Sequence, residues 1–173
     1  MTNIVILQAR LNSKRLPNKV LLNINKFSLI ELAYKRVVSK NFNTLVVIPE
    51  EGENDLLKKK LNFLKIPFKT GSEKNVLKRF ISATKKNDDN DNIVRLTSDN
   101  FFPDRFLIED MLRDFNQNSY NYLTTTDVKS GLPYGCSVEI TKLKFLREAF
   151  RKTKNPYDLE HVTEYIKNNY CIN

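Results

Sequence analysis

Histidine and cysteine are scarce in this sequence of 173 residues, and tryptophan is absent. The single histidine, His161, leaves little material for catalysis by a Ser-His or Cys-His pair. The two cysteines, Cys136 and Cys171, are far apart and have no second cysteine or histidine at the spacing of metal ligands. The sequence therefore argues against these two catalytic classes and against a structural zinc site.

Glycine is also scarce, with four residues, and no apolar run approaches the length of a membrane span. The basic segment after the first apolar run lacks the glycines of a Walker phosphate loop and of the dinucleotide fingerprint. The N-terminus enters the apolar run "IVIL" without a basic leader or a small-residue cleavage site. We therefore expect a soluble, cytoplasmic protein with no membrane partner, in which side chains hold any bound phosphate.

The charge balance is basic, with 29 Lys and Arg against 20 Asp and Glu and a formal net charge of +9. Such a charge suits nucleic acid, an acidic surface or a phosphorylated small molecule. Most of the excess is lysine scattered along helical segments, so we assign function only to charges that cluster. The sequence contains no recognisable nucleic-acid recognition module, and we expect no specific nucleic-acid partner.

Apolar, β-branched runs alternate along the chain with segments of helical periodicity. The expected strands are residues 3–8, 44–49, 66–72, 93–99, 120–126 and 135–140, and the expected helices are residues 28–39, 54–64, 72–86, 104–116, 142–152 and 157–169. Ser28 and Ser72 are expected to cap their helices. This alternation predicts an α/β, three-layer Rossmann-like fold with a mainly parallel mixed sheet and helices on both faces. Without a linker or repeat, we expect one domain, residues 1–173.

Four cations crowd into the segment "QARLNSKRLPNK", directly after the first expected strand: Arg10, Lys14, Arg15 and Lys19. Ligands of open α/β sheets bind beyond the carboxyl ends of the strands, where such a loop would lie. The loop after the fourth long strand contributes Asp99 to the same edge. Cations from one loop and a carboxylate from another are the parts that hold a nucleoside triphosphate and its divalent metal.

The segment "IVILQARLNSKRLPNKVLL" resembles the signature of the cytidylyltransferases that activate acidic sugars. These are the acylneuraminate and 3-deoxy-manno-octulosonate cytidylyltransferases, and the chain is most similar to the branch of spore coat polysaccharide biosynthesis. The resemblance continues in family order through "TGSEKNVLKRF", "IVRLTSDNFFPD", "LPYGCSVEI" and "EHVTEYI". It implies a glycosyltransferase-A-like nucleotidyltransferase that transfers CMP from CTP to an acidic sugar, with release of pyrophosphate and with Mg²⁺ as cofactor.

The resemblance places CTP on the first loop. The implied nucleotide contacts there are Gln8, Ala9, Arg10, Ser13, Arg15 and Lys19. Asp99 matches the family aspartate that coordinates Mg²⁺, and Arg15, Lys19 and Asp99 carry the implied catalytic roles. The alternative interpretation is that Arg15 and Lys19 are surface charges and that Asp99 caps a helix.

Two further segments approach the nucleoside and the sugar in that family. Gly71, Ser72 and Glu73 match the nucleoside segment, although helix capping alone would also explain Ser72. Glu139 lies where the family lines its sugar pocket, and an outward-facing strand residue is an equal alternative. A lone helical histidine is more often packed and hydrogen-bonded, so we give His161 no catalytic role.

The chain departs from the family pattern at several positions. Asn18 stands where glycine is usual, although asparagine tolerates a left-handed φ. Asn75 stands where the family is often acidic and Ser137 where it often has aspartate, which leaves ribose and sugar recognition open. The family also usually continues through a final strand and a "DTPED"-like stretch with a second metal-binding aspartate. We therefore expect a C-terminally shortened fold that lacks this segment.

Three explanations of the shorter chain stay open. The sequence is truncated, or the enzyme is naturally short and takes a ligand from elsewhere, or the chain binds nucleotide without turning it over. The alternative function is therefore a catalytically impaired homologue that acts as a nucleotide-binding or interaction protein. An uncovered strand edge would favour self-association, so a homodimer is a further expectation.

Overall fold

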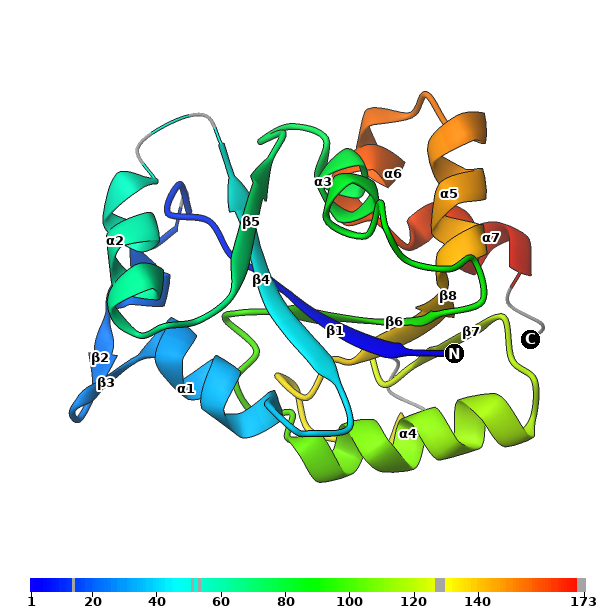
Figure 1. Cartoon of the computed structure of the whole chain (residues 1–173), viewed down its shortest axis with the longest axis horizontal. Helices are drawn as coiled ribbons and strands as arrows, with labels where there is room; N and C mark the ends of the chain where they lie inside the picture. Colours follow the sequence, from blue (N-terminus) through cyan, green and yellow to red (C-terminus); the bar gives the residue numbers. More distant parts are fainter. Residues whose placement is uncertain (14, 51, 53, 127–129, 171–173) are drawn as a thin grey trace.

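A six-stranded sheet of order β5-β4-β1-β6-β8-β7 forms the centre of the molecule in the computed structural model, which describes residues 1–13, 15–50, 52, 54–126 and 130–170 (Figure 1). Its strands are β1 (Asn3–Gln8), β4 (Asn43–Pro49), β5 (Phe68–Gly71), β6 (Asn92–Thr97), β7 (Tyr122–Thr124) and β8 (Glu139–Lys142). Neighbours among β5, β4, β1 and β6 pair in parallel, whereas β8 is antiparallel to β6 and to β7. The predicted mainly parallel mixed sheet is confirmed. Lys14 and Cys171 lie outside the described residues.

Helices cover both faces of the sheet, as the alternating pattern predicted (Figure 1). One layer contains α1 (Leu29–Val37), α2 (Asp55–Phe63) and α4 (Arg105–Gln117), and the other contains α3 (Val76–Ala83), α5 (Leu143–Lys152), α6 (Pro156–His161) and α7 (Glu164–Tyr170). Each layer packs on the sheet through its own cluster of buried apolar side chains. The three-layer α/β architecture is therefore confirmed.

The alternation of side chains along the strands decides which layer each residue meets. On β1, Val5 and Leu7 belong to the core under α1, α2 and α4, whereas Ile4 and Ile6 belong to the core under α3, α5 and α7. Gln8 ends β1 on the same face as Ile4 and Ile6. That face of the sheet therefore turns from apolar to polar at the carboxyl end of the strand.

Helix capping differs from the sequence-based expectation at two serines. Ser28 occupies the N-cap position of α1, but its buried Oγ forms no hydrogen bond with the described residues. Ser72 does not cap α3, because Asn75 does so by accepting a hydrogen bond from the Lys78 N–H at 2.8 Å. Ser72 Oγ instead accepts from the Asn75 N–H at 3.1 Å, which shapes the loop that precedes the helix.

Two expected elements near the C-terminus have different bounds. The strand expected over residues 135–140 is β8, which begins only at Glu139, because Thr125 holds the preceding segment in a loop. Its Oγ1 donates to Cys136 O at 2.7 Å and accepts from the Val138 N–H at 2.9 Å. The single helix expected over residues 157–169 is two helices, α6 and α7, because the chain turns sharply at Val162.

A small hairpin of β2 (Asn23–Ile24) and β3 (Phe27–Ser28) also lies outside the sequence-based expectation. It follows a 3₁₀ helix, η1 (Lys19–Leu21), and precedes α1. Within the described ranges, no helix is both long enough and apolar enough to span a bilayer.

Candidate active site

The first loop is anchored to the sheet while its cations stay at the surface. Leu11 is buried in the core at 2% exposure. The Ala9 N–H donates to Val47 O at 3.0 Å, and the Asn18 N–H donates to Leu11 O at 3.0 Å. Asn18 has a φ of 57°, so it adopts the left-handed backbone for which glycine is usual. The substitution at this position is therefore compatible with the turn.

Lys19 Nζ donates a hydrogen bond to Asp99 Oδ2, which joins the first loop to the loop after β6. Burial raises the pKa of Asp99, but hydrogen bonds from Lys19 and Thr97 outweigh burial and hold the pKa below its usual value. Asp99 is thus a carboxylate at neutral pH. Asp104 caps α4 by accepting from two backbone N–H groups, so the alternative interpretation of Asp99 as a helix cap is wrong.

The remaining side chains of the first loop differ in how strongly they are held. Arg10 Nη1 lies 3.4 Å from Glu160 Oε1 on α6, and both side chains are about half exposed. Arg15 is exposed and forms no ion pair or hydrogen bond with the described residues. Ser13 is half-buried, and its N–H donates to Leu11 O at 2.8 Å. Arg15 is therefore available to an anionic ligand, and Arg10 is held only by a weak, exposed pair.

The loop after β5 is held in place by Arg79 of α3, which is 2% exposed. Its guanidinium donates to Ser72 O at 2.8 and 3.0 Å and to Glu73 O at 3.1 Å. Gly71 allows this close approach, because a Cβ there would lie 3.0 Å from Arg79 Cγ. Asn12 Nδ2 donates to Glu73 Oε1 at 3.1 Å. The predicted nucleoside segment therefore meets the loop of the predicted phosphate ligands.

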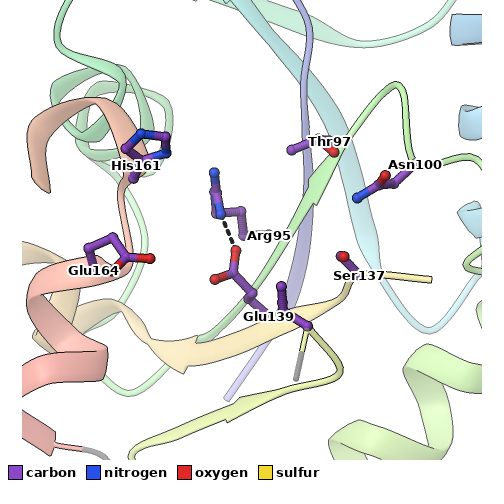
Figure 2. A pocket seen from close by; sticks show the side chains of 8 residues that line it. Arg95, Thr97, Asn100, Ser137, Glu139, His161 and Glu164 are labelled. Carbon is purple, nitrogen blue, oxygen red and sulfur yellow. Dashed lines mark hydrogen bonds and ion pairs between the residues drawn. The ribbon is translucent and has the colours of Figure 1, made fainter. Parts of the chain in front are cut away.

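A polar cavity of about 220 Å³ lies between the carboxyl edge of β6 and the helices α6 and α7 (Figure 2). Figure 2 shows Arg95 and Glu139 at its centre, His161 and Glu164 on one side, and Thr97 and Asn100 on the other. Thr126 and Ser137 complete the lining. Because Thr97 and Asn100 stand on either side of Asp99 in the sequence, the cavity adjoins the contact between Lys19 and Asp99.

Arg95 and Glu139 form an ion pair at the centre of this cavity, and their side chains are 13% and 11% exposed. The register of β6 and β8 places these two residues opposite each other. Arg95 Nε also donates to Gln8 Oε1 at 3.2 Å, and Glu139 Oε1 accepts from Tyr122 OH at 2.6 Å and from Thr163 Oγ1 at 2.7 Å. The alternative interpretation of Glu139 as an outward-facing strand residue is wrong.

The Tyr122 hydroxyl stays protonated and donates within this network. Burial, and then the adjacent Glu139 carboxylate, raise the pKa of Tyr122 far above its ordinary value. Glu139 therefore receives hydrogen bonds from Arg95, Tyr122 and Thr163 at once. A carboxylate held by three donors is fixed in position, so it fixes Arg95 in turn.

A γ-turn at Val162 separates α6 from α7 and shapes one wall of the cavity. Val162 has φ 67° and ψ −55°, and the Thr163 N–H donates to His161 O at 2.7 Å. This backbone is strained for a β-branched residue, and the fully buried Val162 side chain holds it. The turn directs His161 and Glu164 towards the cavity and Thr163 towards Glu139 (Figure 2).

The structure thus brings most of the predicted site residues to one edge of the sheet. Lys19 meets Asp99, Gln8 meets Arg95, and Glu139 lies in the adjoining cavity. The place of Arg95 at the centre of this cavity was not predicted from the sequence. A charged residue among the apolar residues of "IVRLT" was the available signal, because two-residue alternation places it on the face of Gln8.

A magnesium ion fits Asp99 only in part. No group of three or more His, Cys, Asp or Glu side chains that could hold a metal occurs among the residues that the structure describes. Mg²⁺, however, commonly uses one or two carboxylates and takes its other ligands from substrate phosphates and water. Asp99, ionised and 41% exposed, offers one such carboxylate beside the basic loop.

Comparison of the sequence with known proteins gives one consistent family. The cytidylyltransferase family model matches residues 4–172. An uncharacterized protein of Methanocaldococcus jannaschii is 35% identical over 171 residues, covering 98% of this chain and 68% of the relative. The spore coat polysaccharide biosynthesis protein SpsF of Bacillus subtilis is 32% identical over 182 residues, covering 96% of this chain and 70% of the relative.

Solved structures lead to the same conclusion. A cytidylyltransferase from Leptospira borgpetersenii superposes with a TM-score of 0.87 at 28% identity, over 98% of this chain and 72% of that chain. A CMP:2-keto-3-deoxy-manno-octonic acid synthetase solved with CTP shares the fold, with a TM-score of 0.69 at 14% identity, over 98% of this chain and 86% of that chain. The family match, the relatives and the fold agree, and this chain belongs to the cytidylyltransferase family.

Proposed function

We propose that this cytidylyltransferase transfers CMP from CTP to an acidic sugar and releases pyrophosphate, as a step in the synthesis of a surface polysaccharide. One observation carries the proposal. The contact of Lys19 with Asp99 joins a basic loop to a carboxylate at the carboxyl edge of the sheet, directly beside a polar cavity. The basic side suits a triphosphate, and the cavity suits a polyhydroxylated acceptor.

In the proposed complex, the first loop binds the phosphates of CTP. Arg15 and Arg10 offer planar guanidinium groups that can take phosphate oxygens in bidentate fashion. Lys19 offers a compact charge that can follow the leaving pyrophosphate. Ser13, Gln8 and Ala9 border the same loop, and Gly71 and Ser72 border the nucleoside from the loop after β5.

The proposed reaction is a displacement at the α-phosphorus of CTP. An acceptor hydroxyl oxygen forms a bond to that phosphorus, the bond to the bridging oxygen breaks, and pyrophosphate leaves with the electron pair while the hydroxyl proton passes to water. Mg²⁺, held by Asp99 and the phosphates, would supply a Lewis acid for the phosphoryl oxygens. The chain itself contributes alignment of the two substrates and positive charge where negative charge develops.

The acceptor class is proposed from the relatives and from the cavity together. The name of SpsF refers to polysaccharide biosynthesis, and the name of the synthetase of the same fold refers to a keto-deoxy sugar acid. The cavity is lined by hydroxyl, amide, imidazole and charged groups, which suit the hydroxyls of a sugar. Because CTP is a cytoplasmic substrate, we propose the cytoplasm as the place of the reaction.

A second candidate function is nucleotide binding without turnover. It is favoured by the incomplete metal site, since the described residues contain no group of three or more His, Cys, Asp or Glu side chains that could hold a metal. Pyrophosphate release, measured with CTP, Mg²⁺ and a panel of sugar acids, separates the two functions. Turnover with one of the acids supports the transferase, whereas CTP-dependent thermal stabilisation without pyrophosphate supports the binder. Equal turnover with UTP or ATP would contradict the assignment of CTP.

A further inference from the structure

The carboxylate of Glu164 faces the cavity without a partner of its own. Glu164 is half-buried at the start of α7, and its side chain points into the cavity (Figure 2). Its carboxylate forms no ion pair or hydrogen bond with any residue that the structure describes. A half-buried carboxylate without a donor has lost part of its hydration, and no hydrogen bond from the protein replaces it. A ligand that supplies a donor to this carboxylate therefore gains binding free energy.

Glu164 determines the sign of the net charge that the described lining residues carry. Among the lining residues that the structure describes, Arg95 is the one arginine or lysine, and Glu139 neutralises it in a nearly buried pair. Thr97, Asn100, Thr126 and Ser137 are uncharged. The Arg, Asp and Glu side chains of the described lining therefore leave one negative charge, that of Glu164, although the whole chain has a formal net charge of +9.

The carboxylate of a sugar acid has a different place in the proposed reaction. In a 2-keto-3-deoxy sugar acid, the carboxylate and the reacting hydroxyl are bonded to the same carbon atom. In the proposed complex this carboxylate would therefore stay beside the phosphorus of CTP. The far end of the sugar would then enter the cavity, where it would meet Glu164.

We propose that Glu164 binds a protonated amine at the far end of the acceptor, and that the acceptor is an amino-bearing acidic sugar. This inference rests on the proposed function, because it takes the cavity as the acceptor site. An ammonium group gives Glu164 a charge-assisted hydrogen bond. A phosphate or second carboxylate at the same end of the sugar is repelled by Glu164.

The test uses acceptors that differ only in the amine. One pair is 2-keto-3-deoxy-manno-octonic acid and its 8-amino-8-deoxy derivative, and a second is a nine-carbon analogue with a free or an acetylated amine at C7 or C9. For the wild-type chain, kcat/KM from pyrophosphate release is expected to be at least about 10-fold higher for the free amine in one pair, as one charged hydrogen bond allows. Glu164→Gln should abolish this preference through KM, with kcat nearly unchanged.

The control is Asp110→Asn, which removes an exposed acid on α4, away from the cavity. It should keep the preference for the amine. Equal use of both members in every pair, or a preference that survives in Glu164→Gln, overturns the inference and leaves the proposed transfer intact.

If no acceptor is turned over, calorimetric titration measures the affinity of each acceptor directly. The same pairs are titrated into the chain with the α,β-methylene analogue of CTP, which cannot react. Tighter binding of a free amine that disappears in Glu164→Gln supports the amine site even if the transfer proposal fails. Equal binding of both members overturns it.

Discussion

Lys19 and Asp99 are 80 positions apart in the sequence, and Lys19 Nζ donates a hydrogen bond to Asp99 Oδ2. The parallel pairing of β1 with β6 makes this contact, because it places Gln8 opposite Thr97 at the ends of the two strands. In the proposed reaction, the triphosphate would bind the lysine and the divalent cation would bind the carboxylate. Binding of CTP with Mg²⁺ is therefore expected to pull this pair apart or to insert between its members.

Arg15→Ala should reduce turnover on the order of 100-fold, the usual cost of losing a charged donor aimed at developing charge. Stability should hardly change, since Arg15 is exposed and has no partner among the described residues. Pyrophosphate release and urea unfolding measure the two effects. Arg113→Ala, which removes an exposed arginine of α4, is the matched control and should leave both unchanged. An Arg15→Ala chain with wild-type turnover would refute the phosphate role.

Asp99→Asn should lower turnover, raise the Mg²⁺ concentration that turnover requires, and remove a pH-dependent part of the stability. The folded-state pKa of Asp99 lies below that of the unfolded chain, which is about 3.9. The ionised carboxylate thus stabilises the fold above that pH, and its contribution is lost as the pH falls through the folded-state pKa. The difference in unfolding free energy between the wild type and the variant should be constant near neutrality and shrink below about pH 4. A difference that grows in acid would contradict this assignment.

Glu139→Ala should lower the free energy of unfolding by roughly 3–5 kcal/mol, because it leaves the Arg95 charge nearly buried and uncompensated. The double variant Arg95→Met with Glu139→Leu should recover much of this loss, since apolar replacements remove both charges. Denaturant unfolding of the wild type, of Glu139→Ala and of the double variant measures the recovery. A double variant less stable than Glu139→Ala would argue against an ion pair.

Glu160→Gln should tighten the binding of CTP. Glu160 competes with phosphate for Arg10, and its exposed pair contributes only about 0–1 kcal/mol to stability. The affinity for CTP, measured by calorimetry, is expected to rise several-fold at low salt while the unfolding free energy stays the same. The gain should fade as salt screens the charges. An unchanged affinity for CTP at low salt would mean that Arg10 does not bind the phosphates of CTP.

Asn75→Ala should destabilise the fold by about 1 kcal/mol through loss of the cap of α3. Ser72→Ala should cost less, since Ser72 Oγ accepts a single hydrogen bond from the loop and caps no helix. Urea unfolding of the two variants compares the costs directly. A larger loss of unfolding free energy in Ser72→Ala than in Asn75→Ala would contradict Asn75 as the cap of α3.

The architecture was predictable from the sequence because local pattern and tertiary packing agree along most of the chain. Runs such as "IVIL" and "TLVVIP" are apolar on both faces, as strands covered by two helical layers must be, and they became β1 and β4. The prediction was wrong around Val162, because local pattern and tertiary packing disagree there. The residues of this segment favour one continuous helix, whereas the structure breaks the helix at Val162 and buries the valine side chain in the core.

The site was predictable where residues follow strand ends and less so elsewhere. Lys19 and Asp99 come from loops that the strand order brings together, so a parallel sheet was enough to place them at one edge. The place of Arg95 depends on the register of β8, and the place of Glu164 depends on the direction of α7. Local periodicity predicts neither. The catalytic roles of the first-loop residues and of Asp99 remain predictions.

The γ-turn at Val162 sets where His161 and Glu164 stand on the cavity wall. A residue inserted between α6 and α7 would shift the start of α7 and carry Glu164 away from this place. If the cavity takes the acceptor, as proposed, a new specificity is therefore easier to reach by exchange of single side chains than by a change of length, with Glu164, Ser137 and Thr126 as the adjustable positions.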